Sequence, residues 1–312
     1  MNRSSKNFHF AIRVPASTSN LGPGFDVFGL ALGLYLGIEA RPSGTGSHQL
    51  EITGADAADL QNQKRNLILE VARKTAAAHH FKLPGLHLKI HSDIPLARGL
   101  GSSAAAIIGG ISIAECFSRR SFSTSEIFRM ALNFEAHPDN LAACLLGGFT
   151  AAQVDLRRSA WVRRLPLDRH LRVIVAIPEL RISTHLARQV LPPTYPRADV
   201  VSNLQNAVLL SHALGEVSHF ESRHLFSDRL HQPYRARLLP GLTEAIQLPK
   251  MAGLVGVFLS GSGSTLAALA TSNFESIGRR LQKCFSNHGL SSKMQVLSID
   301  RKGRRTRRLK PR

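Results

Sequence analysis

The sequence predicts an α+β protein of two domains, on three observations. The chain has 312 residues, which is enough for one large or two medium domains. Its 43% apolar and 20% charged residues are the proportions of an ordinary globular protein with sizeable cores. Strand-like and helix-like segments follow one another in a mixed order, with a soft boundary around residues 155–172, where we expect one domain to end.

The first half of the chain shows the periodicities of both strands and helices. Alternation of apolar and polar residues predicts strands at 8–14 and 86–95, and a Gly/Pro-rich turn at 20–26 leads into a further strand region at 27–40. Apolar spacing and capping residues predict helices at 66–80, 101–118 and 121–136. Asn66 is placed to cap the first of these, and Ser/Thr followed by Glu is the capping signature of the third.

The second half predicts another set of strands with helices between them. "GGFTAAQVDL" and "LRVIVAIPEL" predict strands on either side of an exposed, arginine-rich stretch at 157–172. The chain is then mostly helical to residue 247, and 253–270 predicts a buried strand, a Ser/Gly turn and a second apolar strand. A helix at 274–288 and a strand at 294–299 complete the pattern.

The formal net charge of +19 is distributed unevenly. Residues 301–312 contain eight Lys or Arg and no acid, so the remaining chain carries +11. We expect this tail to be solvated and disordered, with contacts to nucleic acid or another acidic surface as the alternative. Aromatic residues make up only 6% of the chain and none lies in the tail, which argues against a stacking platform for single strands. A positive body also suits an anionic substrate.

Several classes of protein are disfavoured. No run of about 18 apolar residues predicts a transmembrane helix, and the N-terminus lacks the apolar core of a signal peptide. The three cysteines, Cys116, Cys144 and Cys284, are odd in number and widely spaced, so we expect buried free thiols rather than disulfides or a metal site. We therefore expect a soluble, cytoplasmic protein.

The stretch "PLARGLGSSAAAIIGG" at 95–110 lies between a predicted strand and a predicted helix. Gly99 and Gly101 allow positive φ and let a phosphate approach the backbone, and the first turn of the helix offers unpaired amides and partial positive charge. The loop matches GxGxxA, but the second strand ending in an acid that a dinucleotide fold requires does not follow. It also lacks the lysine of a Walker A loop. A phosphate-binding loop and a plain packing turn remain as alternatives.

Three blocks taken together favour the phosphate-binding loop. "VPASTSNLGPGFDVFGLAL" begins at residue 14, the glycine loop begins at 95, and "SGSGST" lies at 260–265. Their order and spacing resemble the GHMP kinases over roughly residues 8–300. Within that superfamily, "EAHPDNLAACLLGGF" and "ISTHLARQVLP" are similar to the homoserine kinase family. The resemblance implies a ribosomal-protein-S5 domain 2-like domain at 1–165, a ferredoxin-like domain at 166–300, the basic tail at 301–312, and an active site between the domains.

The resemblance implies transfer of the γ-phosphoryl group of MgATP to the side-chain hydroxyl of L-homoserine, a step of threonine biosynthesis. Glu135 matches the acid that holds Mg²⁺, with a hydroxyl from Ser102 or Ser103, although a helix-end surface acid is the plain alternative. Arg98 is expected at the rim or in a structural role, with a catalytic role as the alternative. The residues expected to bind ATP are Pro95, Leu96, Ala97, Arg98, Gly99, Leu100, Gly101, Ser102, Ser103, Ala104 and Ala105.

The resemblance also implies a pocket for a zwitterion with one hydroxyl. Asp26 would meet the ammonium group, Asn20 would orient the hydroxyl, and two arginines would grip the carboxylate. The structural alternatives are turn chemistry beside Gly-Pro, a helix cap at "HPDN" and a solvated arginine at 235. The positions carried over are Asn20, Asp26, His137, Asp139, Thr184, Arg188, Arg235 and Gly261.

Asn140 stands where mevalonate-kinase relatives place a basic aspartate. Because an amide does not usefully accept a proton, we expect Asn140 to align the hydroxyl and the proton to pass to the transferred phosphate. Removing Asp139 should then impair homoserine binding more than the chemical step. Ala97, Ala136 and Ser264 depart from the residues common in the family by small-for-small changes, which leave room for a different substrate preference.

Two other functions compete with this hypothesis. Another GHMP small-molecule kinase would differ only in its acceptor pocket. A basic nucleic-acid-binding protein with an S5-like domain would explain the charge but not three separate Gly/Ser blocks. We expect L-homoserine and MgATP as partners, no membrane, no nucleic acid apart from tail contacts, and a homodimer by analogy with the family.

Overall fold

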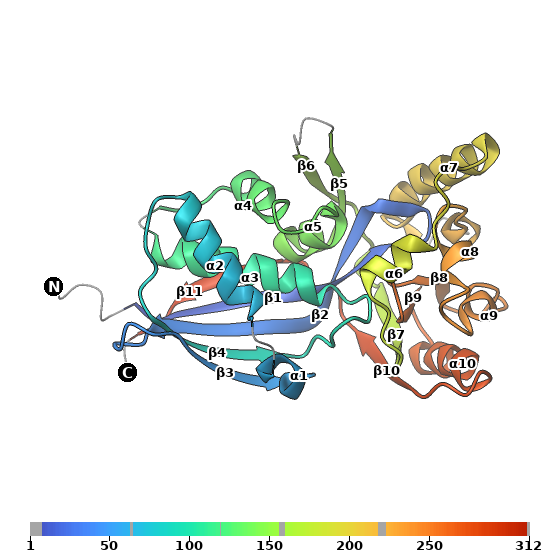
Figure 1. The fold of residues 1–312 in the computed structure, drawn as a ribbon. Coiled ribbons are helices and arrows are strands. Elements are labelled where there is room, and N and C mark those ends of the chain that lie inside the picture. Colours follow the sequence, from blue (N-terminus) through green and yellow to red (C-terminus); the bar gives the residue numbers. More distant parts are fainter. Residues whose placement is uncertain (1–7, 63–64, 119, 156–159, 218–222, 311–312) are drawn as a thin grey trace.

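The computed structural model describes residues 8–62, 65–118, 120–155, 160–217 and 223–310, and it confirms the α+β class. Two sheets lie side by side, each with helices packed on it (Figure 1). The first sheet contains β1 (Phe10–Asn20), β2 (Gly24–Pro42), β3 (Gln49–Gly54), β4 (Leu86–Ser92), β5 (Phe149–Val154), β6 (Ala160–Leu165) and β11 (Arg305–Arg308). The second contains β7 (Arg172–Pro178), β8 (Leu254–Leu259), β9 (Leu266–Ala270) and β10 (Ser292–Leu297).

The first sheet has the strand order β11-β1-β2-β4-β3, with β5 and β6 joined to β2. Every pairing is antiparallel except that of β3 with β4. Ile12 and Val14 of β1 are buried while Arg13 between them is exposed, as the alternation in the sequence predicts. One face of the sheet is therefore apolar and needs a covering layer.

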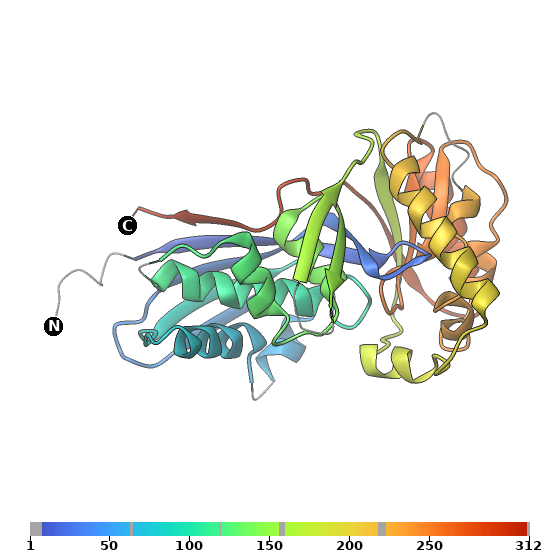
Figure 2. The ribbon, with the colours of Figure 1, turned by 90° about the horizontal axis from the view of Figure 1, so that it is seen from above.

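Helices cover that face (Figures 1 and 2). They are α2 (Leu67–Ala78), α3 (Ser102–Phe117), α4 (Thr124–Ala131) and α5 (Pro138–Leu146), while the short α1 (Ala57–Gln61) follows β3. The predicted caps are confirmed, because Asn66 accepts the Leu69 amide at 3.1 Å and Ser123 forms a reciprocal capping box with Glu126. Within the described residues, no helix is long and apolar enough to cross a membrane.

The second sheet is antiparallel throughout, with the order β10-β7-β9-β8. Residues along β7 alternate between two cores. Val173 and Val175 join the core that continues from the first domain, whereas Ile174 and Ala176 pack with residues of α10 (Phe274–Ser286). The shared core fixes the second sheet against the first domain, so the boundary between them is a packed interface.

The β1–β2 hairpin carries first-domain residues into the second domain. The Asn203 side-chain amide donates to the Pro23 carbonyl oxygen at 2.6 Å, and His231 Nε2 lies 2.8 Å from the Gly22 carbonyl oxygen. Gly22 has φ +81, and a Cβ there would lie 2.4 Å from the Phe226 carbonyl oxygen. The elements beside this hairpin tip are α6 (Thr184–Gln189), α7 (Arg197–Ala213), η3 (Arg223–Phe226), α8 (Gln232–Arg235) and, further on, α9 (Leu242–Ile246).

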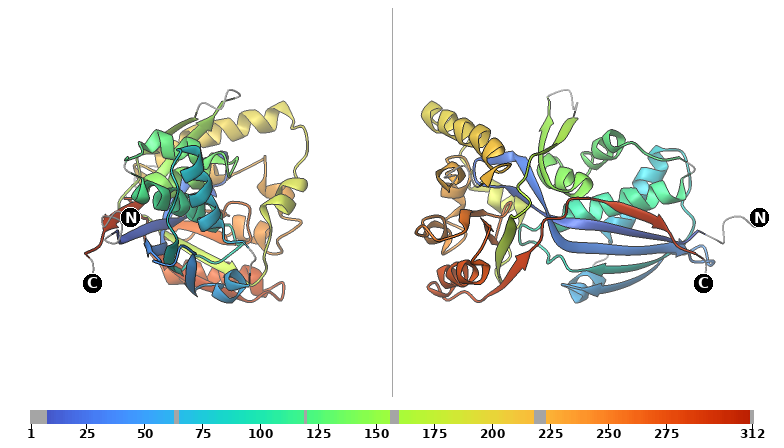
Figure 3. Two further views of the ribbon diagram at one scale, coloured as in Figure 1. Left: turned by 60° about the vertical axis from the view of Figure 1, so that its left-hand side comes forward. Right: turned by 180° about the vertical axis from the view of Figure 1, so that it is seen from behind.

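The prediction of a disordered tail is wrong for residues 301–310, while 311–312 lie outside the described residues. After β10 the chain returns to the first domain (Figure 3), and residues 305–308 pair antiparallel with β1 at the edge of the sheet. Arg304 forms an ion pair with Glu115 of α3, and Arg305 forms one with Asp300 at 2.5 Å. The composition of the tail shows its positive charges. It does not show that the fold brings the carboxylates of Glu115 and Asp300 next to two of them.

The exposed, arginine-rich stretch is described only from residue 160 onward, since 157–159 lie outside the described residues. Arg163 and Arg164 of β6 are exposed, as expected. The last strand of this part of the first sheet ends at Leu165, and the first strand of the second sheet begins at Arg172.

Candidate active site

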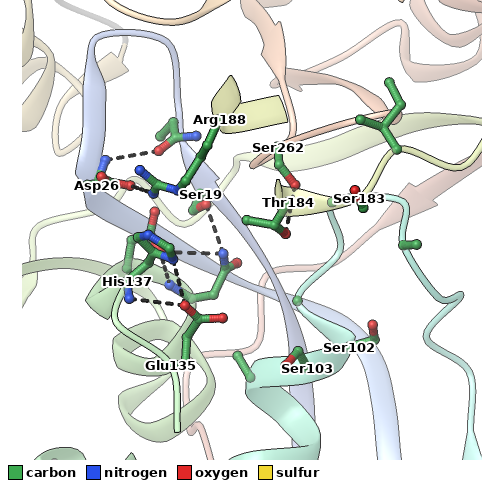
Figure 4. A pocket seen from close by; sticks show the side chains of 18 of the residues that line it. Ser19, Asp26, Ser102, Ser103, Glu135, His137, Ser183, Thr184, Arg188 and Ser262 are labelled. Carbon is green, nitrogen blue, oxygen red and sulfur yellow. Dashed lines mark hydrogen bonds and ion pairs between the residues drawn. The ribbon is translucent and has the colours of Figure 1, made fainter. Parts of the chain in front are cut away.

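A pocket of about 320 Å³ lies between the two domains (Figure 4). Its walls come from the β1–β2 hairpin, the loop before α3 with the first turn of that helix, the start of α5, and the region of α6. The sequence-predicted residues that line it are Asn20, Asp26, Ala97, Gly99, Gly101, Ser102, Ser103, Ala104, Glu135, His137, Asp139, Asn140, Thr184, Arg188 and Arg235. Pro95, Leu96, Arg98, Leu100, Ala105 and Gly261 are not among the lining residues.

The glycine loop ends at Gly101, the N-cap residue of α3. Gly99 and Gly101 have φ of +73 and +72, in the region that favours glycine. A Cβ at Gly101 would lie 2.1 Å from Ser17 Oγ, and one at Gly99 would lie 2.1 Å from the Ser260 carbonyl oxygen. Conformation and close approach both require glycine here. The result is a long helix whose unpaired first-turn amides open toward the pocket, an arrangement suited to an anion.

Arg98 attaches this loop to the second domain. Its Nε donates to the Pro178 carbonyl oxygen at 2.8 Å and its Nη1 donates to that of Leu96 at 3.2 Å. Asp56 accepts the Leu96 amide at 2.7 Å and pairs with Arg181 at 2.8 Å. These contacts give Arg98 the structural role that was one of its two expected roles. The sequence analysis missed Asp56 and Arg181, because no local motif marks either residue.

The Asn140 carboxamide is held between two serines of β1. Ser17 Oγ donates to Asn140 Oδ1 at 2.8 Å, and Asn140 Nδ2 donates to Ser19 Oγ at 3.0 Å. The two hydroxyls reach the same carboxamide because alternate residues of a strand point the same way. The sequence analysis missed both serines, although the alternation in "VPASTSN" could have found them. The carboxamide orientation is thus fixed beside the pocket.

Glu135 and His137 form a pair just before and at the start of α5. Glu135 Oε1 lies 2.6 Å from His137 Nδ1 and also accepts the His137 amide at 3.2 Å. Burial alone would raise the pKa of Glu135, but the hydrogen bonds and charge of His137 outweigh it and hold this pKa below its ordinary value. Glu135 is therefore an ionised carboxylate at neutral pH.

The donors around Glu135 suit a magnesium ion bound together with phosphates. Magnesium is usually held by one or two carboxylates, with phosphate oxygens and water completing its shell. Within the described residues, no group of three His, Cys, Asp or Glu side chains could hold a metal by itself. The Glu135 carboxylate and the Ser102 and Ser103 hydroxyls line the same pocket (Figure 4). This donor set fits magnesium that arrives with a nucleotide.

Asp139 is a buried carboxyl, with only 2% of its surface exposed. Burial raises its pKa to about 6, and the negative charge of Asp26 adds to that shift. The Asn140 amide, which donates to Asp139 Oδ1 at 2.7 Å, and the Ser19 hydroxyl act in the opposite direction. A carboxylate kept in such surroundings gains most from a cationic partner.

Asp26 and Arg188 are predicted site residues that pair with each other. Arg188 Nη2 lies 2.6 Å from Asp26 Oδ1, and both side chains are about one-third exposed. Arg188 Nε is buried and has no hydrogen-bond partner within the described part of the chain. A buried donor without an acceptor is costly, and a planar guanidinium suits a carboxylate. The pair can therefore receive a zwitterion, with a carboxylate at Arg188 and an ammonium at Asp26.

Arg235 and Asn20 meet at the Gly261 carbonyl oxygen, which accepts from Arg235 Nη1 and from Asn20 Nδ2, each at 3.0 Å. Arg235 Nε also donates to the Ala187 carbonyl oxygen at 3.1 Å. The Asn20 carboxamide oxygen accepts the Asp26 amide at 3.1 Å. Burial, aided by the Arg188 cation, lowers the pKa of Arg235 to about 10. Arg235 is thus buried against the pocket rather than solvated, and Gly261 acts through its carbonyl.

Phe25 lies between the two arginines. The guanidinium carbons of Arg188 and Arg235 are 5.5 and 5.4 Å from the centre of its ring, within the range of cation–π attraction. The ring also stacks on His231 at 5.1 Å, and burial lowers the pKa of His231, which favours its neutral form. The ring attracts two like charges that would otherwise repel each other. Phe25 was missed because an aromatic residue in a turn carries no local functional signal.

A second pocket, of about 180 Å³, adjoins the first and shares Ser102 and Ser103 with it. Its walls are mainly apolar and include Leu36, Ile52, Ile68, Ile90 and Leu96, with Asn66 among the polar residues. A molecule whose phosphates bind at the start of α3 can place a flat apolar group here. The sequence analysis did not identify this pocket, because its residues come from β2, β3, β4 and α2.

Thr184 and Arg188 lie on one helix, α6, as their spacing predicts. Thr184 Oγ1 is 3.3 Å from Ser262 Oγ, which belongs to the "SGSGST" block and also lines the pocket (Figure 4). The three Gly/Ser blocks quoted from the sequence therefore meet at one place in the fold.

Comparison with known proteins gives matches over nearly the whole chain. A family model described as the GHMP kinases N terminal domain matches residues 66–148, and one described as GHMP kinases C terminal matches 204–287. Homoserine kinase of Solibacter usitatus is 38% identical over 302 residues, covering 96% of this chain and 98% of the relative. Homoserine kinase of Aquifex aeolicus is 36% identical, with 94% of this chain and 97% of the relative covered.

Solved structures of known proteins also resemble this fold over nearly the whole chain. Homoserine kinase from Cytophaga hutchinsonii superimposes with a TM-score of 0.84 at 24% identity, covering 98% of this chain and all of that one. The L. major mevalonate kinase, solved with R-mevalonate, superimposes with a TM-score of 0.65 at 13% identity, covering 96% of each chain. At these identities the two likenesses concern the fold alone.

Proposed function

The chain belongs to the homoserine kinase family of the GHMP kinases, and on that premise we propose that it phosphorylates the side-chain hydroxyl of L-homoserine with ATP. The reaction yields O-phospho-L-homoserine and ADP, a step of threonine biosynthesis. Phosphoryl transfer depends mainly on alignment and on neutralising charge, so the residues of the pocket are assigned by those two tasks.

The start of α3 binds the phosphates. Gly99 and Gly101 let the phosphate chain lie against the backbone, and the amides of the first turn donate to its oxygens. The adjoining apolar pocket receives the adenine ring. Glu135, with Ser103 or Ser102, would hold the magnesium ion, which would supply positive charge to neutralise the phosphates. His137 keeps the Glu135 carboxylate ionised and oriented for this purpose.

The opposite wall binds the amino acid. Arg188 offers its buried Nε to the substrate carboxylate, and Arg235 adds positive charge behind it. Asp26 and Asp139 are the two carboxylates available to the ammonium group. A bound amino acid would replace part of the Asp26–Arg188 ion pair, because its ammonium group would contact Asp26 and its carboxylate would contact Arg188. Each charged group would therefore still have a partner of opposite charge.

Asn140 aligns the reacting hydroxyl. Ser17 and Ser19 hold its carboxamide in one orientation, and an amide at this position accepts no proton. The hydroxyl proton then passes to an oxygen of the transferred phosphoryl group as the new O–P bond forms and the bond to ADP breaks. Asn20 supports this wall through the hairpin backbone and Gly261, and Thr184 closes it beside Ser262.

The single observation that carries the acceptor assignment is the buried Nε of Arg188, which has no hydrogen-bond partner within the described residues and lies beside the Asp26 carboxyl group. It calls for a ligand with a carboxylate next to an ammonium group. Mevalonate, shikimate and galactose each lack one of these groups or both, so they fit this wall less well than an amino acid does.

The test is coupled ADP release with MgATP against L-homoserine, mevalonate, shikimate, galactose and L-threonine. We expect turnover with homoserine alone. Turnover with another acceptor would keep the phosphate site and refute the acceptor assignment. Absence of ADP with every acceptor would refute the kinase proposal itself.

A decarboxylated analogue, 3-amino-1-propanol, tests the role of Arg188 directly. The wild type should prefer homoserine by at least about 100-fold in kcat/KM, because a site built to bind a carboxylate rejects a ligand without one. Arg188→Met should abolish most of that preference. Arg163→Met, at an exposed arginine of β6, is the matched control and should leave the preference intact. An unchanged preference in Arg188→Met would contradict the assignment.

The remaining expectations stay predictions. A cytoplasmic location and a homodimer are implied by the family. Two of the eight basic residues of the tail, Arg304 and Arg305, pair with acids of the same chain, which reduces the charge available to the nucleic-acid alternative.

A further inference from the structure

Asp56 of the first domain holds one residue beside each of the two substrate sites. Its Oδ2 accepts the Leu96 amide at 2.7 Å, and its Oδ1 accepts from Arg181 Nη2 at 2.8 Å. Leu96 belongs to the glycine loop and lines the apolar pocket, whereas Arg181 belongs to the second domain. Asp56 itself is not among the residues described along the walls of either pocket. Its effect on the substrates must therefore pass through the residues that it holds.

The backbone keeps Asp56 in a fixed place. Gly54 ends β3 with φ +96, where a Cβ would lie 2.2 Å from the Ser92 carbonyl oxygen, and the Ala55 amide donates to the same oxygen at 2.7 Å. Asp56 follows with φ +52, a left-handed conformation that Asp adopts more readily than most residues. The turn that carries Asp56 is thus attached to the end of β4, from which the chain runs on into the glycine loop.

Asp56 occupies the N-cap position of α1 without capping that helix. An aspartate at this position commonly accepts an amide of its own helix. In the part of the chain that the structure describes, the Asp56 side chain forms no such bond, and its oxygens instead bind partners 40 and 125 residues away. The position in the sequence favours a local use of this carboxylate, whereas the fold gives it a long-range one.

The Oδ2 contact fixes the nucleotide side of the site. Leu96 contributes to the wall that we assign to adenine, and Gly99, which opens toward the phosphates, follows three residues later. Arg98 Nη1 lies 3.6 Å from the same Oδ2 and donates to the Leu96 carbonyl oxygen at 3.2 Å. A part-buried amide that loses its acceptor is costly unless its segment moves to reach another one. Oδ2 therefore fixes the segment where the base and phosphate sites meet.

The Oδ1 contact fixes the amino-acid side of the site. Arg181 comes directly before residues 182–184, which line the pocket between the domains. Helix α6 begins at Thr184 and carries Arg188, the residue assigned to the substrate carboxylate. A movement of Arg181 would therefore be transmitted to the start of α6, and so to Arg188.

Arg181 also pairs with Asp59, which is a weaker anchor. Arg181 Nη1 lies 2.6 Å from Asp59, whose side chain is 47% exposed, whereas that of Asp56 is 18% exposed. Ion pairs between solvated side chains contribute little, because water screens them and both side chains lose freedom. Asp59 holds Arg181 at the surface, and Asp56 joins Arg181 to the glycine loop.

We propose that Asp56 is a positioning residue for phosphoryl transfer, with one carboxylate oxygen for the wall of each substrate site. Oδ2 positions the loop that binds the nucleotide, and Oδ1 positions the segment that leads to Arg188. The inference rests on the proposed function. Phosphoryl transfer depends on the alignment of two bound substrates, so a residue that joins the walls of both sites controls their geometry without touching either substrate.

Variants that remove the two contacts separately test this proposal. Calorimetric titration with magnesium and the β,γ-methylene analogue of ATP gives the nucleotide Kd, and steady-state kinetics at saturating MgATP gives the homoserine KM. Asp56→Ala removes both contacts, so each constant should rise at least about fivefold. Asp56→Asn keeps an oxygen for the Leu96 amide but loses the charge that attracts Arg181. Its nucleotide Kd should stay within about twofold of the wild type while its homoserine KM rises about fivefold, and Arg181→Met should show the same pattern.

Glu275→Gln is the matched control, because Glu275 is 76% exposed and pairs with Arg279 within α10. It should leave both constants unchanged. Thermal melting must show that each variant is folded, and Asp56→Asn with Arg181→Met decides the outcome if Asp56→Ala is not. Unchanged constants in the folded Asp56 variants would overturn the proposal. An equal rise of the nucleotide Kd in Asp56→Ala and Asp56→Asn, or a rise in Arg181→Met, would overturn the division between the two oxygens.

The two measurements also separate a failure of this inference from a failure of the proposed function. A wild type that does not bind the nucleotide analogue would refute the kinase proposal and this inference with it. A wild type that binds the analogue but does not phosphorylate homoserine would refute the acceptor assignment. The nucleotide Kd values of Asp56→Ala and Asp56→Asn would still decide the role of Oδ2 in that case.

Discussion

Asp139→Asn should make the free protein more stable while weakening its function. The pKa of the Asp139 carboxyl is about 6 in the folded chain, whereas its ordinary value, taken for the unfolded chain, is 3.8. At about 1.36 kcal/mol for each pH unit, the folded state of the wild type is penalised by about 3 kcal/mol at neutral pH. Asparagine has nearly the same shape, keeps an oxygen for the Asn140 amide and carries no charge, so it avoids this cost.

The pH dependence gives the prediction its sign. The Asp139 pKa is raised on folding, so its contribution to stability is fully present below 3.8 and is lost as pH rises through about 6. Denaturant unfolding of both proteins should therefore give a difference of about 3 kcal/mol in favour of Asp139→Asn at pH 7.5, shrinking to about 1 kcal/mol at pH 4.5. No gain at pH 7.5, or a gain that does not shrink with acid, would refute this reasoning.

Steady-state kinetics of the same variant separates two roles for Asp139. If this carboxylate attracts the ammonium group, Asp139→Asn raises the homoserine KM much more than it lowers kcat. If kcat vanishes while the homoserine KM stays unchanged, Asp139 takes the hydroxyl proton, and the assignment of that proton to the phosphoryl group is wrong.

Three further perturbations test other parts of the site and fold. Phe25→Leu should raise the homoserine KM about tenfold and leave the ATP KM unchanged, because two cation–π contacts are lost. Phe25→Tyr keeps an aromatic ring and is the control. Equal changes in both KM values of Phe25→Leu would contradict this prediction. Gly101→Ala should lower both kcat and Tm, since its Cβ would meet Ser17 Oγ at 2.1 Å. Gly44→Ala, at a similar φ in open space, should lower Tm only slightly. Equal losses of Tm in the two variants would argue against the close approach at Gly101. Deleting residues 304–312 should lower the free energy of unfolding by about 3 kcal/mol or more, because Glu115 loses its ion-pair partner and β1 loses the strand at its edge. An unchanged denaturation curve would show that β11 does not contribute to stability.

Local signals predicted most of the elements. Alternation marked β1 and β4, and the caps at Asn66 and Ser123 marked the starts of α2 and α4. These signals work because they concern residues within one or two turns of each other. The tail was predicted wrongly for the opposite reason. Its strand depends on hydrogen bonds to β1 and on Glu115, which are remote in sequence.

The candidate site shows the same division. The motifs quoted from the sequence assigned Asn140, Arg188 and the glycine loop to one site, and in the structure they line one pocket. What the motifs could not give is how these side chains are held, since Asn140 depends on serines 123 and 121 residues away and Arg98 depends on a carbonyl 80 residues away. Phe25 belongs to this second group, because only the fold reveals that two cations share its ring.

The route of the chain, which returns to the first sheet only after completing the second, also affects synthesis. A ribosome produces β1 before the whole of the second domain and β11 only after it. Throughout elongation the edge of β1 lacks its final neighbour, and an unpaired edge is where chains pair wrongly with one another. N-terminal domains commonly fold first during translation, yet this one is completed only after the second domain and β11 have been synthesised. A premature stop between β10 and β11 would leave a kinase with both domains present and an open edge at β1 that favours aggregation.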